Sequence, residues 1–228
     1  MKVTVSNLIR WSGLAAMAAG IIFAGIQPIH PPDELSSVTT TAWAIITPLK
    51  TVMALFFLLG TTGLYARQVE KAGWLGLVGF LMFSLSWAFN FAYIFAEAFI
   101  LPELVTSAPQ FVDGLLGISF GRPSEVSLGV LPALYSLLSI LFLLGGLLLG
   151  IATFRAGILP PWAALMFAAS CALTPAAALL PHHIQRLAGV PIGLTFAWLG
   201  FALLFARQDA VQSVPSLGTS RLRQTGTD

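Results

Sequence analysis

The sequence predicts an all-α membrane protein, and three observations support that fold class. Of its 228 residues, 57% are hydrophobic and only 9% are charged, whereas about a quarter of the residues in an average soluble domain are charged. The mean hydropathy is +0.89. The hydrophobic residues gather in six runs, each near the length of about 20 residues that crosses a bilayer as a helix. We therefore expect a single domain over residues 1–207 that forms a bundle of six transmembrane helices.

The six runs define the expected spans. Their bounds are 11–29, 42–65, 74–101, 128–152, 162–180 and 190–206. The third run holds 28 residues, so we expect its outer end to project from the bilayer or to tilt. The first run follows Lys2 and Arg10, and a cleaved signal peptide is the alternative for it, although the run is long for a signal peptide and no clear A-x-A cleavage site precedes Pro28. In the outer connection after the third run, residues 110–119 have the spacing of a short interfacial helix.

Lysine and arginine residues are divided unequally between the two sides of this arrangement. If the amino terminus is cytoplasmic, eight of them lie on the inner side and only Lys50, Arg122 and Arg186 on the outer side. Because basic residues concentrate in cytoplasmic segments, we expect a multi-pass protein of the cell membrane with both termini cytoplasmic. Residues 208–228 are rich in Ser, Thr, Gln and Gly, which predicts a disordered cytoplasmic tail.

Tryptophan and arginine recur at the ends of the runs. They are Trp11, Trp74 and Trp162 at the starts of the odd-numbered runs, and Arg67, Arg155 and Arg207 after the even-numbered ones. One interpretation is anchoring at the membrane interfaces, where both residue types gather. The alternative is a parallel repeat of three helical hairpins, which would place a ligand at the interface between repeats.

Small residues at intervals of four predict close helix packing. They include Ala16, Gly20 and Ala24 in the first run, Ala164, Ala168, Ala172 and Ala176 in the fifth, and the pairs Gly146/Gly150 and Gly189/Gly193. Small side chains let helix backbones approach one another in lipid. We expect these faces inside the bundle, and contacts in a homo-oligomer are the alternative. The bilayer itself is the one partner that the composition requires.

A polar seam marks the third run. Ser86, Asn90, Tyr93 and Glu97 follow at i, i+4, i+7 and i+11, so they share one helix face. By helical rise, Asn90 and Gln27 reach a similar height above the inner interface. We expect a polar cavity that opens outward. Its candidate ligand-binding residues are Gln27, Lys50, Asn90, Tyr93 and Glu97.

Lys50 is the most informative of these residues. It precedes Tyr65 by 15 positions, which places it about 22 Å above the inner boundary, within the outer part of the membrane. An ionisable residue at such a depth indicates a functional site with a partner, which we expect to be Glu97 or Asn90. The alternative is that the long side chain of Lys50 reaches the outer headgroups.

Few residues suggest metal or cofactor chemistry. His30, His182 and His183 are the weak metal candidates, because all three fall on the outer side but lack the H-E-x-x-H or H-x-x-x-H spacing. The chain has no Walker A loop, G-x-S-x-G elbow or C-x-x-C motif, so we expect no cofactor and no resident metal. The single cysteine, Cys171, excludes an intrachain disulfide. The basic residues are scattered, so we expect no nucleic-acid partner.

Three functions fit these features. We expect a non-enzymatic membrane protein that binds a small amphiphile, lipid or ion in the outer cavity, or that serves as a subunit of a larger assembly. The alternative is a small secondary transporter, which prolines such as Pro175 inside the runs and the hairpin repeat would favour. The second alternative is an intramembrane enzyme acting on a lipid headgroup, with Glu97 as general base and His182 or His183 as acid or ligand.

Overall fold

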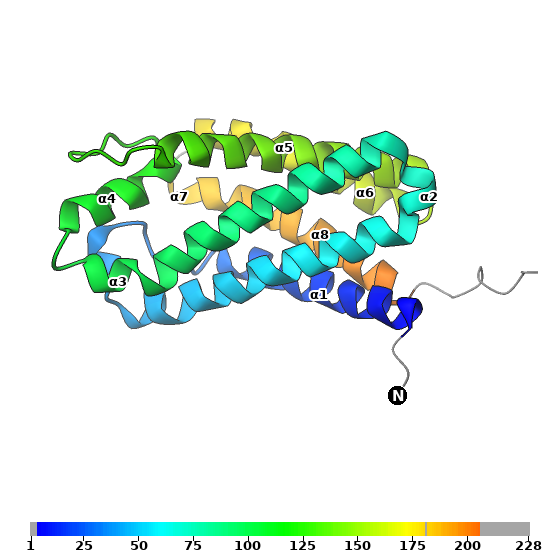
Figure 1. The fold of residues 1–228 in the computed structure, drawn as a ribbon, viewed down its shortest axis with the longest axis horizontal. Coiled ribbons are helices and arrows are strands. Elements are labelled where there is room, and N and C mark those ends of the chain that lie inside the picture. Colours follow the sequence, from blue (N-terminus) through cyan, green and yellow to red (C-terminus); the bar gives the residue numbers. More distant parts are fainter. Residues whose placement is uncertain (1–3, 181, 206–228) are drawn as a thin grey trace, which may run out of the picture.

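The computed structural model describes residues 4–180 and 182–205, and this part of the chain is all-helical without a β-strand. Four helical segments are long and apolar enough to cross a membrane (Figure 1). They are α1 (Val5–Ile26), α2 (Thr41–Phe99), α5 (Leu131–Ala156), and the segment Arg186–Phe205, which joins the short η4 (Arg186–Ala188) to α8 (Gly189–Phe205). The predicted tail 208–228 lies outside the described residues.

Helix α2 is a hairpin of two arms, residues 41–72 and 74–99, that reverses at Gly73 (Figure 1). Gly73 has φ +57° and ψ −162°, a conformation that is essentially confined to glycine. Stacked rings hold the arms together, with Tyr65 on Phe80 at 4.5 Å between centroids and Phe57 on Trp87 at 3.8 Å. Only Gly73 is non-helical between the runs 42–65 and 74–101, because the first helical arm continues through residues 66–72.

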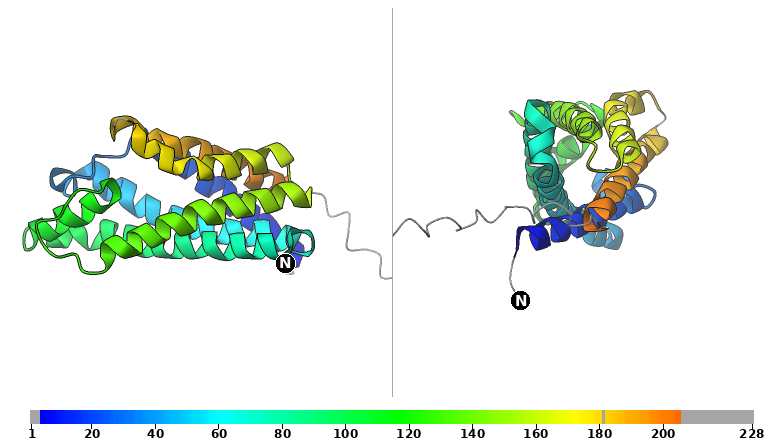
Figure 2. Two further views of the ribbon diagram at one scale, coloured as in Figure 1. Left: turned by 90° about the horizontal axis from the view of Figure 1, so that it is seen from above. Right: turned by 90° about the vertical axis from the view of Figure 1, so that its right-hand side faces the viewer.

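The long helices form a closed ring in which neighbours along the chain are also neighbours in space (Figure 2). Helix α1 packs against the first arm of α2 and against α8, the second arm packs against α5, and α6 (Pro161–Ala172) lies between α5 and α8. Glycines bring α1 and α8 together: a Cβ on Gly20 would lie 2.3 Å from the carbonyl oxygen of Gly193. Ala16, Ala164 and Ala168 are likewise buried within the chain, whereas Ala176 is exposed.

The fifth span departs from its expected length. We predicted a helix over 162–180, but α6 ends at Ala172 and continues as the 3₁₀ helix η3 (Thr174–Leu179). Pro175 explains the change, because proline lacks an N–H and disfavours the α conformation of the residue before it. A short α7 (His182–Gln185) then leads to η4.

A small cap closes the end of the bundle opposite Gly73 (Figure 1). It consists of η1 (Leu35–Ser37), α3 (Leu101–Leu104), α4 (Pro109–Gly117) and η2 (Ile118–Phe120). Its own apolar core contains Val38, Trp43, Leu101, Val112, Leu115 and Leu116. The short helix expected over residues 110–119 corresponds to α4 and η2 of this cap.

Aromatic side chains fill the middle of the ring. Phe57, Phe83, Phe167 and Phe196 are at most 1% exposed, and Trp87 is 3% exposed. Each ring contacts others from different helices; for example, the centroid of Phe57 lies 4.6 Å from that of Phe196. The interior between the cap and the Gly73 end is therefore tightly packed.

Candidate functional site

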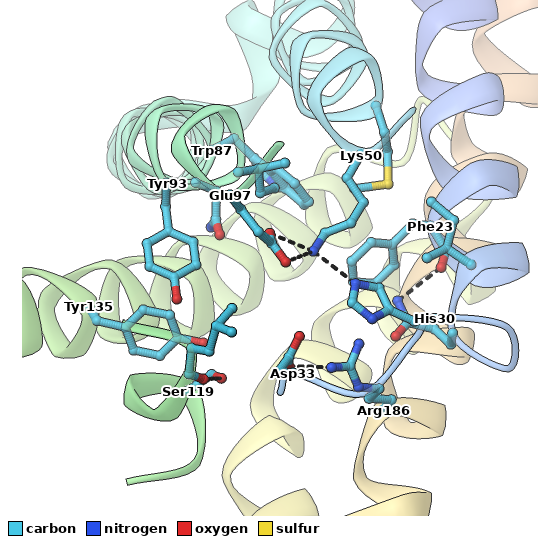
Figure 3. Close-up of a pocket in the computed structure, with 16 residues that line it drawn as sticks. Phe23, His30, Asp33, Lys50, Trp87, Tyr93, Glu97, Ser119, Tyr135 and Arg186 are labelled. Atoms are coloured by element: carbon cyan, nitrogen blue, oxygen red, sulfur yellow. Dashed lines mark hydrogen bonds and ion pairs between the residues drawn. The ribbon is translucent and has the colours of Figure 1, made fainter. Parts of the chain in front are cut away.

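A cavity of about 220 Å³ lies at the cap end of the bundle (Figure 3). Its wall is built by the end of α1, the connection before α2, both arms of α2, the cap, the start of α5 and η4. The lining residues are Phe23, Ile26, Gln27, His30, Asp33, Lys50, Met53, Trp87, Asn90, Tyr93, Ile94, Glu97, Leu116, Ser119, Tyr135 and Arg186. The structure thus brings Gln27, Lys50, Asn90, Tyr93 and Glu97 into one wall.

The ammonium group of Lys50 is held by three acceptors. It donates to both carboxylate oxygens of Glu97, at 2.8 and 2.7 Å, and lies 2.9 Å from Nε2 of His30 (Figure 3). The side chains of Lys50 and Glu97 are only 16% and 5% exposed. Since an ammonium group has three N–H donors, this arrangement satisfies Lys50 completely. Lys50 therefore forms an interior pair with Glu97 instead of extending to headgroups.

His30 acts as a neutral acceptor in this cluster. Its Nδ1 lies 2.6 Å from the carbonyl oxygen of Pro31, which accepts hydrogen bonds only, so we assign the ring proton to Nδ1. Nε2 is then free to accept from Lys50. Burial, followed by the charges of Lys50 and Arg186, lowers the pKa of His30 from 6.5 to about 2. The imidazole therefore adds no charge to the cavity near neutral pH.

A second ion pair joins Asp33 to Arg186. A guanidinium nitrogen of Arg186 donates to a carboxylate oxygen of Asp33, and the two side chains are 24% and 12% exposed. The main-chain carbonyl of Asp33 also accepts a hydrogen bond of 3.0 Å from Arg122. The connection between α1 and α2 is thus tied both to the segment after η2 and to the segment before α8.

Polar groups on the remaining wall are held by main-chain contacts. The hydroxyl of Tyr93 donates to the carbonyl of Leu115 at 2.9 Å, which joins α2 to the cap. The side-chain amides of Asn90 and Gln27 donate to the carbonyls one turn earlier in their own helices, those of Ser86 and Phe23. These hydrogen bonds use the NH₂ group of each side chain, so the amide oxygen can still accept a hydrogen bond.

The deep side of the cavity is apolar and aromatic. Phe23, Met53 and Trp87 line it, and the ring of Phe23 meets that of Trp87 edge to face at 5.9 Å. The indole N–H of Trp87 is buried and has no hydrogen-bond partner among the described residues. Buried N–H groups are normally satisfied, so this unpaired donor is an exception within the apolar side of the cavity.

Several residues of the cavity were not among the sequence candidates. Asp33, Arg186 and Tyr135 line it although they are distant from the polar seam in the chain. A signal for Asp33 and Arg186 existed, because both are charged residues on the expected outer side, where few basic residues occur. Of the weak metal candidates, His30 reaches the cavity, whereas the side chains of His182 and His183 lie outside the described part of the structure.

The atoms of His30, Asp33 and Glu97 that could bind a metal lie within 4.8 Å of one another. A nitrogen and two carboxylate oxygens would suit Zn²⁺. In this structure, however, Lys50 already neutralises Glu97 and Arg186 neutralises Asp33. A divalent ion would leave two uncompensated positive charges in a largely buried cluster, which is unfavourable.

The fold and the cavity define an all-α protein with membrane-length helices and two ion pairs at one end of the bundle. Comparison of the chain with protein-family models, with curated proteins and with solved structures found no match in any of the three. The chemistry of the lining residues is therefore the basis for inferring the function of the cavity.

Proposed function

We propose that the chain crosses the cell membrane six times and binds the polar end of a small amphiphile in the cavity at the cap end. Four crossings would come from α1, the two arms of α2 and α5, and one from α8. The sixth would be α6 with η3. Their 12 and 6 residues rise about 1.5 and 2.0 Å each, which together gives about 30 Å, the thickness of the hydrocarbon core.

The charge distribution supports an orientation with both termini cytoplasmic. The amino-terminal end of α1 and the end of α8 lie at the Gly73 end of the bundle (Figure 1). Arg67, Lys71 and Arg155 lie near that end in sequence, whereas the cap end holds Lys50, Arg122 and Arg186. With Lys2, Arg10 and the three arginines after α8, the cytoplasmic side would carry eight of eleven basic residues. The cavity would then open to the exterior.

One observation supports amphiphile binding above all: the same cavity has charged groups on one side and aromatic groups on the other. Two partly buried ion pairs and the phenol of Tyr93 offer hydrogen bonds, while Phe23, Met53 and Trp87 offer apolar contact. Ligand sites commonly combine a mainly apolar lining with a few fixed polar groups. At about 220 Å³, the cavity is smaller than the roughly 300–1,000 Å³ of typical ligand pockets, so it suits a headgroup and the first atoms of a chain.

Two features favour binding over the alternatives. The stacked rings of Phe57 and Trp87 lie between the cavity and the Gly73 end, so transport would require this packing to open. For an enzyme, Glu97 would have to act as a base, but both its oxygens accept hydrogen bonds from Lys50. Glu97 would have to give up a hydrogen bond from Lys50 before it could take a proton from a substrate.

Filling the cavity tests the proposal. The purified full chain in detergent is titrated with dihexanoyl phospholipids that carry different headgroups, and heat is measured by calorimetry. We expect saturable binding of at least one lipid at one molecule per chain, and loss of binding in Ser119→Trp, which adds an indole at the cavity wall. Ser136→Trp is the matched control, because Ser136 is exposed on α5 and does not line the cavity. Absence of saturable binding, or equal binding by Ser119→Trp, would refute the proposal.

The orientation is tested separately. A peptide tag is added after Asp228, and intact cells are treated with protease. We expect the tag to be digested only after the cells are permeabilised. Digestion in intact cells would place the cavity on the cytoplasmic side.

A further inference from the structure

We infer that the cavity recognises a primary ammonium group within a zwitterionic headgroup of the phosphoethanolamine type. This inference rests on the proposed binding function and adds the class of ligand. It is carried by the position of two carboxylates relative to the open space, by the distance between them and by the charge balance of the cavity.

The negative ends of the ion pairs face the open part of the cavity. In Figure 3, the carboxylates of Glu97 and Asp33 border an open space that the phenols of Tyr93 and Tyr135 close on the other side. Lys50 approaches Glu97 from the side of His30, away from that space. A ligand in the space therefore meets acceptor groups first, and these favour a cationic donor.

The distance between the two carboxylates fits a primary ammonium. One oxygen of Asp33 and one of Glu97 lie within 4.8 Å of each other. An ammonium that donates charge-assisted bonds of about 2.7–2.9 Å along two of its tetrahedral N–H groups spans about 4.4–4.7 Å between the two oxygens, which is close to this separation. A trimethylammonium has no N–H to donate, and its methyl carbons must stay about 3.3–3.6 Å from each oxygen. The site should therefore distinguish ethanolamine from choline headgroups.

The charge balance requires an anionic group on the same ligand. Lys50 and Arg186 offset Glu97 and Asp33, and His30 is neutral, so the charges of the cavity wall sum to zero. A ligand with a net charge would bring an uncompensated charge into a poorly solvated space. A zwitterion brings none.

Arg186 provides the contact for that anionic group. Among the described residues, its guanidinium donates a side-chain hydrogen bond only to Asp33, out of five N–H donors. The remaining donors suit the oxygens of a phosphate, which arginine binds with two parallel hydrogen bonds. Two sources share this chemistry: a phosphoethanolamine lipid and a free zwitterion such as O-phosphoethanolamine.

The experiment compares headgroups on the purified full chain by calorimetry. The probes are dihexanoyl phosphatidylethanolamine, phosphatidylcholine and phosphatidylglycerol, together with free O-phosphoethanolamine and Zn²⁺. We expect phosphatidylethanolamine to bind at least tenfold more tightly than the other two lipids. Binding of the lipid but not of O-phosphoethanolamine would identify the membrane as the source. Binding of O-phosphoethanolamine without binding of any lipid would support the ammonium site and refute the proposal that the ligand is an amphiphile.

Variants locate the preference in the two carboxylates. We expect Asp33→Asn to reduce the preference for ethanolamine over choline to less than threefold. If Asp33→Asn does not fold, the double variant Lys50→Met with Glu97→Gln replaces it in the test. This variant removes the other carboxylate together with its counter-charge, so the cavity stays neutral. Glu103→Gln is the control, because Glu103 is exposed on α3 and does not line the cavity.

The outcomes separate the inference from the function on which it rests. Equal affinity for ethanolamine and choline lipids, abolished by Ser119→Trp, would refute the ammonium site and leave amphiphile binding intact. Binding of Zn²⁺ without binding of any zwitterion would refute the inference in favour of a metal site at His30, Asp33 and Glu97. No binding of any probe would refute both.

Discussion

The indole N–H of Trp43 donates a hydrogen bond of 3.1 Å to the main-chain carbonyl of Glu97. Trp43 is fully buried, and the two residues lie near the open ends of the α2 hairpin, 54 positions apart. The carbonyls of the last helical turn have no partner within the helix, so Trp43 satisfies one of them. The same bond sets the height of Glu97 opposite Lys50, which lies two turns after Trp43 on the first arm.

Replacing Trp43 with Phe should therefore weaken the hairpin. The variant keeps a ring in the cap core but leaves the Glu97 carbonyl without its donor, which costs about 1–3 kcal/mol for a buried acceptor. Unfolding of the detergent-solubilised chain in a denaturing detergent titration measures this loss. Trp74→Phe is the control, because Trp74 is 81% exposed, and it should change stability by less than about 0.5 kcal/mol. Equal effects of the two changes would exclude a structural role for the Trp43 bond.

The Lys50–Glu97 pair should show strong coupling. Lys50→Met leaves the nearly buried carboxylate of Glu97 without a counter-charge, and breaking a buried pair in this way costs about 3–5 kcal/mol. Adding Glu97→Gln removes the unpaired charge and should restore most of the lost stability. A double-mutant cycle in the same unfolding assay measures the coupling.

The exposed pair Arg122–Asp113 provides the comparison for this cycle. Its atoms lie 3.7 Å apart, with side chains 43% and 52% exposed, so its coupling should stay below about 1 kcal/mol. A coupling of Lys50 to Glu97 no larger than that of the exposed pair would show that the interior pair does not hold in solution.

His30 should make the folded state less stable as the pH falls. The folded protein keeps the imidazole neutral, because its pKa is lowered to about 2, whereas the unfolded chain binds a proton below pH 6.5. Protons therefore bind to the unfolded state alone, and stability falls by about 1.4 kcal/mol per pH unit below 6.5. The contribution is complete above pH 6.5 and is lost progressively toward pH 2.

The comparison with His30→Gln isolates this effect, because glutamine offers an acceptor to Lys50 and does not titrate. Between pH 7.5 and 5.5, the wild type should lose about 1.4 kcal/mol more stability than the variant. Other titrating groups affect both proteins alike and cancel. If stability changed with pH equally in the two proteins, His30 would bind a proton in the folded state as readily as in the unfolded state.

Two glycines of α1 should respond oppositely to alanine. A Cβ on Gly20 would lie 2.3 Å from the Gly193 carbonyl oxygen and 2.5 Å from the Ala197 nitrogen, so Gly20→Ala should force α1 and α8 apart and cost about 1–3 kcal/mol. A Cβ on Gly25 meets nothing within 4 Å, so Gly25→Ala should be neutral or stabilise by up to about 1 kcal/mol. Thermal unfolding of the two variants measures the difference. A tolerated Gly20→Ala would show that the two helices are less closely packed than in this structure.

The sequence predicted the all-helical class because apolar runs of spanning length leave few other folds. It also suggested Glu97 or Asn90 as a partner of Lys50, because an ionisable residue at the depth of Lys50 needs a polar partner. It could not predict that the chain reverses at Gly73 alone. The residues before Gly73 are polar, which is typical of a loop, but they also have high helix propensity. The early end of α6 was signalled by Pro175, but proline inside an apolar run is compatible with a kink as well as with a stop.

The second ion pair shows what a one-dimensional pattern misses. Asp33 and Arg186 are 153 positions apart, in the connection after α1 and in η4, and no single helical period relates them to each other. They meet only because α1 and α8 pack side by side through Gly20 and Gly193, which brings the connections at their ends together. That adjacency depends on the closed order of the ring, which hydropathy does not encode.

The hairpin form of α2 has a consequence for the proposed insertion into the membrane. Lys50 and Glu97 both belong to residues 41–99, so the acid and the base emerge from the ribosome within one continuous stretch and need no later helix to meet. If the two arms insert together, as the proposed topology implies, the ammonium and the carboxylate would neutralise each other before lipid surrounds them, which would reduce the cost of placing either charge there. Insertion of this polar pair would then depend on the turn at Gly73, because that turn brings the two arms side by side.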